Sequence, residues 1–198
     1  IFGNISLFDY RAEFRMYNGS FIPAFYNKNY ERNRAAYAEE VMTYLGKIKG
    51  DSSTAGTNVL GVYAEGGFEV ENHLSMDLGY MWPLEIKSDG SLGSSDDDIF
   101  HLGIVVDPGI VPDFPIHGKI AYDRTKFAST FDASKSLDFF DVNTVVTAEI
   151  SYELAKNVDL TMLYTTAVAR DSSGKVTYTS GVADINSSVS VNVKVKPL

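Results

Sequence analysis

Charged side chains recur at every second position in several segments of this sequence, so that they share one face of a β-strand. The acids in this pattern are Asp9, Glu13, Glu65, Glu69, Asp77, Glu85, Asp107, Asp123, Glu149, Glu153 and Asp159, and the bases are Arg11, Arg15, Lys119, Lys194 and Lys196. A buried charge is costly unless it is paired or hydrated. The spacing therefore predicts an ion-pair network, in which twelve residues are candidates: Asp9, Arg11, Glu13, Arg15, Glu65, Glu69, Asp77, Lys119, Asp123, Glu149, Lys194 and Lys196. Since acids outnumber bases, a water-filled path along this face would prefer cations.

Two histidines, His101 and His117, fall on the same polar face of neighbouring segments. A turn centred near Val111 would place His101 opposite Ala121, so that the two imidazoles lie roughly 13 Å apart along the strands. One metal ion cannot bridge that distance, and the sequence predicts no metal site and no cofactor.

No other group of residues has the spacing of a catalytic centre. The serine-rich loops 51–54, 91–95 and 171–173 set no hydroxyl against a histidine, and His73 is expected in a solvated turn. Residues 96–98 are three aspartates without the glycine and glutamate of a calcium-binding loop. Glu153 and Asp159 should face each other across a tight turn, as solvated rim residues. We therefore expect no catalytic residues and no enzymatic activity.

The elements that position these charges are long alternating segments of apolar and polar residues. Leu74, Met76, Leu78, Tyr80 and Trp82 occupy every second position of one of them. Eight such segments are predicted as strands, at 5–17, 57–70, 73–86, 98–107, 115–126, 142–155, 158–169 and 185–196. Short connections follow the second, fourth and sixth strands, and long ones follow the others. This segregation predicts one all-β antiparallel up-and-down barrel over residues 1–198, with the first strand closing onto the eighth.

Closure should bring Asp9 and Glu13 near Lys194 and Lys196, with Arg11 and Arg15 facing Glu65 and Glu69. In the first long loop, apolar residues at helical spacing predict an amphipathic helical insertion at 28–46.

The direction of the two faces decides between a membrane barrel and a water-soluble one. No charge interrupts the apolar set, while the polar set mixes charges with Gly61, Gly67, Gly79 and Gly103, as a crowded interior would. An eight-stranded barrel has little room inside, and the many aromatic residues of the apolar set would overfill it. The pattern favours an apolar face that looks outward at lipid. The candidate lipid-facing residues are Leu74, Met76, Leu78, Tyr80, Trp82, Leu160, Met162 and Tyr164.

With these faces and loops, the chain resembles the small eight-stranded outer-membrane β-barrel proteins of bacteria. The resemblance implies a transmembrane barrel in the bacterial outer membrane, with a structural or surface-interaction role and a lumen filled by its charge network. Its partners would be the lipid bilayer and, through the long loops, cell-surface or envelope proteins.

Composition excludes some classes of function and leaves two alternatives open. A net charge of −9 and the absence of a basic cluster argue against a nucleic-acid partner, and the absence of cysteine removes thiol chemistry. The abrupt start at Ile1, the lack of a terminal aromatic residue and the long first loop motivate one alternative. It is a cation-preferring pore, or the C-terminal portion of a larger porin-like barrel. The second alternative is a soluble lipocalin-like barrel that binds a ligand.

Overall fold

The computed structural model of this chain is an antiparallel β-sheet, and it describes residues 1–17, 58–70, 73–95, 98–108, 116–131, 139–141, 143–169, 171 and 175–195. The long strands are β2 (Phe8–Tyr17), β3 (Asn58–Val70), β4 (Leu74–Ile86), β6 (Ile99–Val106), β7 (Ile116–Thr125), β8 (Thr144–Ala155), β9 (Val158–Val168) and β12 (Ile185–Val195). These eight strands match the eight predicted segments, which confirms the all-β antiparallel class. The predicted helix at 28–46 lies outside the described residues.

Short elements complete the fold: β1 (Phe2–Ile5), β5 (Leu92–Ser94), β10 (Tyr178–Thr179), β11 (Val182–Ala183) and the 3₁₀ helix η2 (Phe127–Phe131). The sequence did not predict them as separate elements. Among the described residues, no helix has the length and apolar character needed to span a membrane.

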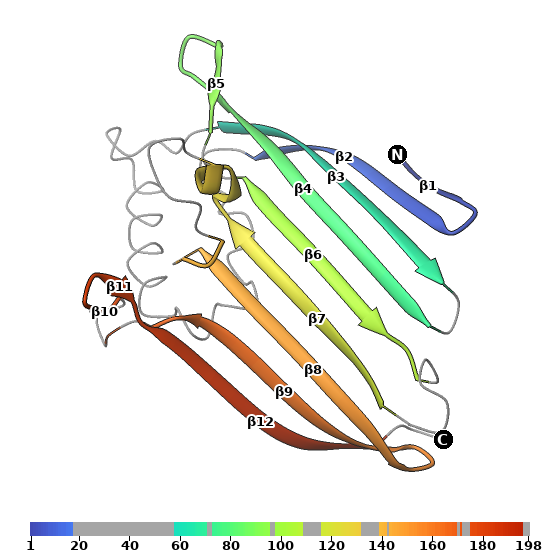
Figure 1. Ribbon diagram of the computed structural model, residues 1–198. Helices are drawn as coiled ribbons and strands as arrows, with labels where there is room; N and C mark the ends of the chain where they lie inside the picture. The colour runs from blue at the N-terminus through green and yellow to red at the C-terminus, as the bar shows by residue number, and fades with distance from the viewer. Residues whose placement is uncertain are drawn as a thin grey trace.

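The sheet runs in the order β1-β2-β3-β4-β6-β7-β8-β9-β12, with β5 paired to the end of β4. Each long strand pairs with its neighbour in the chain, and the sheet curves strongly, so that β1 and β12 form its two margins (Figure 1). The strand pairing contains no bond between β12 and β2 in the part of the chain that the structure describes. The predicted closure of the first strand onto the eighth is therefore not formed.

The first predicted strand, 5–17, is in fact a hairpin. Ser6 has a positive φ of 59°, which turns the chain, and β1 then pairs with the first half of β2, from Phe2 opposite Arg11 to Ile5 opposite Phe8. The pairing extends to Ile1, whose backbone exchanges hydrogen bonds of 2.8 and 2.7 Å with Ala12. The β1 strand thus occupies part of the edge that closure would require.

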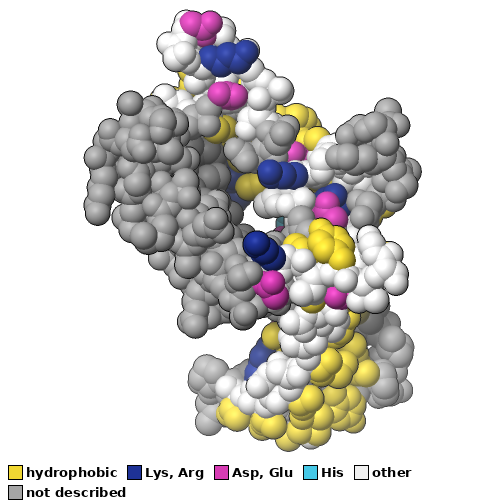
Figure 2. Space-filling model, turned by 90° about the vertical axis from the view of Figure 1, so that its left-hand side faces the viewer, with side chains coloured by type: hydrophobic (Ala, Val, Ile, Leu, Met, Phe, Trp, Pro, Cys, Tyr) yellow, Lys and Arg dark blue, Asp and Glu magenta, His cyan; other side chains and the backbone are white. Residues whose placement is uncertain are grey.

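The apolar face of the sheet is exposed, and the polar face is buried. On the apolar face, Phe14 is 70% exposed and Val191 is 63% exposed, whereas on the polar face Ser151 and Thr161 are 2% and 1% exposed. In Figure 2, hydrophobic side chains gather on the outside of the lower part of the molecule, and charged side chains surround the central hollow. The polar face is the crowded inner side of the curved sheet, and the apolar face is the outer side.

Candidate functional site: the polar inner face

Glycines make the inner face close-packed, as the sequence predicts. Each lies beneath a large side chain from the neighbouring strand: Met81 covers Gly61, Asp9 covers Gly67, Tyr63 covers Gly79 and Asp77 covers Gly103. A Cβ added at Gly61 or Gly67 would lie 2.5 or 2.6 Å from the covering side chain. The missing side chains therefore provide the space that the larger inner side chains occupy.

The first ion-pair cluster joins β2 to β3. Arg11 contacts Glu13 at 3.1 Å and Glu65 at 3.6 Å, and Arg15 Nη2 lies 2.6 Å from Glu13. The Arg15 guanidinium stands 4.0 Å from the centre of the Tyr63 ring, and the Tyr63 hydroxyl donates to Glu65. The predicted contact between Arg11 and Glu65 is thus confirmed. Arg15 lies opposite Gly61 instead of meeting Glu69, because Glu69 pairs with Ser75 near the other end of β3.

The second cluster is centred on His101 of β6. Its Nε2 lies 2.8 Å from Asp77 on β4, and its Nδ1 lies 2.5 Å from Asp123 on β7. Both ring nitrogens can donate only in the imidazolium form, which is the form that suits two carboxylate acceptors. In that form the cluster is a cation held between two anions, and it links three strands.

This arrangement corrects the predicted register between the two histidine-bearing strands. His101 lies opposite Asp123, not Ala121, because the observed pairing is shifted by two residues from a turn centred at Val111. A two-residue shift keeps every side chain on its face, so the alternation contained no sign of it. His117 is six residues before Asp123 on β7, which places the two histidines roughly 20 Å apart along the strands.

The third cluster spans β7, β8 and β12. Glu149 contacts Lys194 at 2.7 Å and Lys119 at 3.5 Å. Lys194 reaches over β9 to make this contact, so the predicted approach of Asp9 and Glu13 to Lys194 is not present. Lys196 lies outside the described residues.

The fourth cluster lies nearer the tight turns and is buried. His117 Nε2 is 3.6 Å from Asp159, whose side chain is 3% exposed, and the Ser151 hydroxyl is 2.9 Å from that of Thr161. Asp159 faces Glu153 as predicted, but it is not a solvated rim residue. Ser151 of β8, which is not part of the serine-rich loops considered in the sequence, is directly opposite His117.

Ser151 is nevertheless a poor nucleophile in this setting. Its hydroxyl is occupied by Thr161, its side chain is buried, and His117 Nδ1 is buried with no hydrogen-bond partner among the described residues. Nor does any group of three or more His, Asp or Glu side chains in the described ranges have an arrangement that could hold a metal ion. The four clusters are suited to cross-strand pairing.

The charges of these clusters balance if both histidines are protonated. Their ion pairs join six carboxylates to four Lys or Arg side chains and two histidines, so the network is neutral when both histidines are charged. The other acids of the polar set are Asp9, Glu69, Glu85, Asp107 and Glu153, which lie toward strand ends. The excess negative charge that the sequence predicts is therefore found near the rims, not in the middle of the face.

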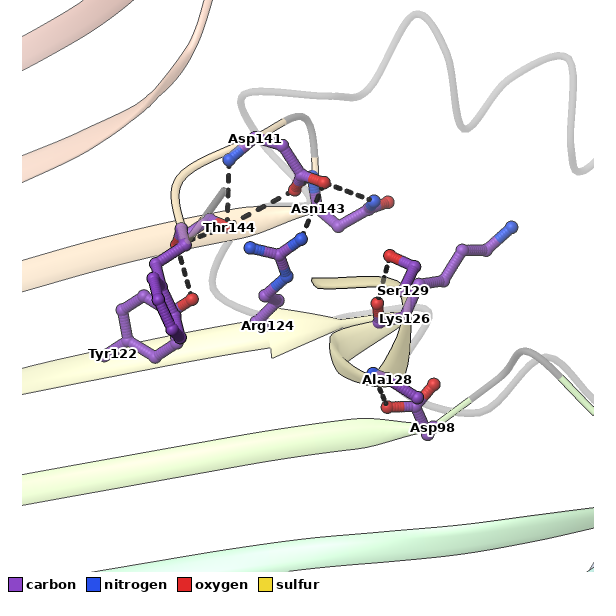
Figure 3. A network of polar contacts seen from close by, with 10 residues as sticks. Asp98, Tyr122, Arg124, Lys126, Ala128, Ser129, Asp141, Asn143 and Thr144 are labelled. Carbon is purple, nitrogen blue, oxygen red and sulfur yellow. Dashed lines mark hydrogen bonds and ion pairs between the residues drawn. The ribbon is translucent and has the colours of Figure 1, made fainter. Parts of the chain in front are cut away.

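The outer face carries a feature that the sequence did not reveal. Asp98 and Arg124 are in phase with the apolar set, and they are 3% and 2% exposed. Arg124 binds Asp141 at 2.8 Å, and Asp98 accepts from the Ala128 N–H at 2.8 Å (Figure 3). Asp98 also accepts from the Tyr80 hydroxyl at 3.2 Å. Here η2 and residues 139–141 cover the outer face. On β6 and β7, the uncharged apolar surface therefore ends before Asp98 and Arg124, at the long-connection ends of the strands.

An aromatic cluster lies at the same end of the outer face, around η2. Phe127 of η2 stacks on Phe100 with centroids 4.1 Å apart, and Phe131 continues the cluster toward Phe139. Two candidate lipid-facing residues join this cluster: Tyr80 makes an edge contact with Phe127 at 6.3 Å, and Trp82 makes an edge contact with Tyr80 at 4.5 Å. All eight candidate lipid-facing residues lie on the outer face, and Met76, Leu78, Trp82, Leu160 and Met162 are among its exposed hydrophobic side chains.

Comparison with known protein families, with curated proteins and with solved structures finds no match for this chain.

Proposed function

We propose that this chain forms a transmembrane β-barrel of a bacterial outer membrane. The barrel has a structural or surface-interaction role and no enzymatic activity. The observation that carries the proposal is the inverted burial of the sheet. Phe14, Trp82 and Val191 are more than half exposed on the outer face, while polar side chains are buried on the inner face. A soluble protein rarely exposes so large an apolar surface, whereas hydrocarbon chains of lipid would cover it.

Strand length supports a membrane-spanning sheet. The eight long strands contain 8 to 13 residues. A tilted strand needs roughly 9 to 11 residues to span a bilayer. The aromatic cluster around η2 lies near the long-connection end of β4, β6 and β7, a position that suits the boundary between lipid and water.

The balanced ion pairs favour a filled interior over an open pore. Carboxylates in the middle of the inner face already have Lys, Arg or His partners, and glycines let neighbouring side chains lie across the strands. A continuous cation path would need hydrated acids along its length, and the acids outside the network lie toward the ends of strands.

The first experiment tests membrane insertion. Purified chain is refolded with phosphatidylcholine vesicles and floated on a density gradient, and its solubility is compared with and without detergent. Flotation with the vesicles supports the proposal. A monomer that stays in solution without detergent would support the soluble ligand-binding barrel and overturn it.

A pair of substitutions makes this test specific to the outer face. Val191→Arg places a charge on the face that we assign to lipid, and it should lower insertion by about 2–4 kcal/mol. Ser190→Arg places the same charge on the inner face of the same strand and should have a smaller effect. Equal effects would contradict the assigned direction of the faces.

Conductance separates the filled barrel from the pore. Planar bilayers containing the inserted protein should show no steady openings of porin size. Steady cation-selective openings would instead favour the transport alternative.

A further inference from the structure

His101 stands between two carboxylates that come from the two strands beside its own. Its Nε2 lies 2.8 Å from Asp77 of β4, and its Nδ1 lies 2.5 Å from Asp123 of β7. We propose that this cluster is a pH-sensitive joint: it holds the three strands together while the imidazole is charged, and it loosens and admits water when the imidazole is neutral. This inference rests on the proposed function, because it concerns the inside of an inserted barrel.

The two forms of the ring differ in the number of hydrogen bonds that they can donate. The imidazolium carries a proton on each nitrogen and can donate to Asp77 and Asp123 at the same time. Neutral imidazole carries one proton, so its other nitrogen presents a lone pair to a carboxylate oxygen at 2.5 or 2.8 Å. Two acceptors repel each other at that distance, and one of the two contacts must therefore open.

Beyond the two aspartates, the charged and titratable groups on this part of the inner face belong to β2 and β3. Glu65 of β3 lies in the same row of opposed residues as His101, with Gly79 between them. It is held by Arg11 and by the Tyr63 hydroxyl. The other described inner-face neighbours of His101 on β4, β6, β7 and β8 are uncharged: Gly79, Met81, Ile99, Gly103, Ala121, Thr125 and Val145. Among the described residues, His101 and its two carboxylates therefore set the charge of the joint.

Water can reach the joint. The side chains of Asp77, His101 and Asp123 are 42%, 28% and 32% exposed. Protons can therefore exchange between the ring and the solvent while the sheet stays folded. Because histidine changes its charge between about pH 5 and pH 8, the joint responds to pH within that range.

Loosening of the joint changes the middle of the inner face. The Asp77 side chain lies over Gly103, whose partner on β7 is Ala121. A carboxylate that loses its imidazole donor needs water in its place, because an unpaired charge is costly away from solvent. Loss of the ring proton also removes a positive charge from between Asp77 and Asp123. The middle of the inner face therefore becomes more hydrated and more negative as pH rises.

Single cysteines measure this change in hydration, because the chain has no cysteine of its own. Ala121→Cys places a thiol next to Gly103, which Asp77 covers, and Ser190→Cys places a reference thiol at an exposed position of the same face. Chains that have floated with phosphatidylcholine vesicles are labelled with a cationic methanethiosulfonate at about pH 5 and at about pH 8. The ratio of the two labelling rates, Cys at 121 over Cys at 190, removes the effect of pH on thiol reactivity itself.

The ratio should rise by at least about fivefold at the higher pH, because loss of one hydrogen bond to a partly exposed charged group shifts an opening equilibrium by that much. Two variants fix the charge of the joint. His101→Gln should give a high ratio at both pH values, and His101→Arg should give a low ratio at both. His73→Gln, in the exposed connection between β3 and β4, should behave as the unsubstituted chain does.

A ratio that stays constant with pH would overturn the joint, and so would a pH-dependent ratio that persists in His101→Gln or His101→Arg. Asp77→Asn tests the same joint without a change to the histidine. Its amide can donate to neutral imidazole, so the pH dependence of the ratio should fall by at least about half, and an undiminished dependence would contradict the proposal. Flotation separates this failure from failure of the proposed function: chains that float without a pH-dependent ratio refute only the joint, whereas chains that do not float refute membrane insertion.

Discussion

Replacement of His101 by leucine should destabilise the folded sheet. The His101 ring lies 2.8 Å from Asp77 and 2.5 Å from Asp123, and so joins β4, β6 and β7; as the imidazolium it donates to both carboxylates. A hydrogen bond to a charged group contributes about 1.5–3 kcal/mol. All three side chains are partly exposed, so solvent screening favours the lower end of that range for each bond. His101→Leu should therefore lower the free energy of unfolding by about 3 kcal/mol.

The assay is urea unfolding of the chain in detergent micelles, followed by the fluorescence of Trp82, the single tryptophan. His73→Leu is the matched control, because His73 is exposed in the connection between β3 and β4. Its replacement should change stability by less than about 0.5 kcal/mol. Combining His101→Leu with Asp123→Asn should cost less than the sum of the two single changes, since both remove the same contact. Equal losses for His101→Leu and His73→Leu would refute the role assigned to the imidazolium.

Three further predictions concern other parts of the molecule. In Gly118→Ala the new Cβ would meet the Glu149 backbone oxygen at 2.5 Å, whereas in Gly66→Ala the nearest contact is at 4.0 Å. The same urea titration should therefore show a free energy of unfolding lowered by about 2 kcal/mol for Gly118→Ala and little changed for Gly66→Ala. Asp98→Ala removes the acceptor of the Ala128 N–H and should make the chain more sensitive to trypsin at Lys126, whereas unchanged cleavage would contradict a role in holding η2. Hydrogen bonds from the Ser91 hydroxyl and N–H lower the pKa of Asp89, so this contact stabilises the fold above the ordinary carboxyl pKa and is lost as pH falls through the lowered value. Ser91→Ala should raise that pKa, as followed by the carboxyl carbon resonance of Asp89, and no change would show that the hydroxyl does not contribute.

Much of the inner face could be predicted because alternation is a local property. The positions of Arg11, Glu65, His101 and Asp123 on one face follow from counting residues, and the contact between Arg11 and Glu65 was predicted correctly. The triad of Asp77, His101 and Asp123 was missed because its formation depends on a two-residue difference in register. That difference changes neither the face of any residue nor the composition of either strand.

The alternation also could not predict which charged residues are buried on the outer face. Asp98 and Arg124 extend the apolar phase of their strands, and nothing in the alternation indicates that η2 and Asp141 would cover them. When only its own segment is considered, a charged residue at a strand end is predicted to be solvated. Its burial depends on connections that fold back over the strand.

The sequence by itself determined the eight long strands, the side of the sheet that each residue occupies and the placing of glycines on the crowded inner face. These properties have a period of two residues and need no knowledge of other strands. Only the tertiary structure decided which residues meet across strands, that β1 occupies half of the β2 edge, and that Lys194 contacts Glu149. These contacts depend on turn geometry and on packing between distant segments, which a local pattern does not contain.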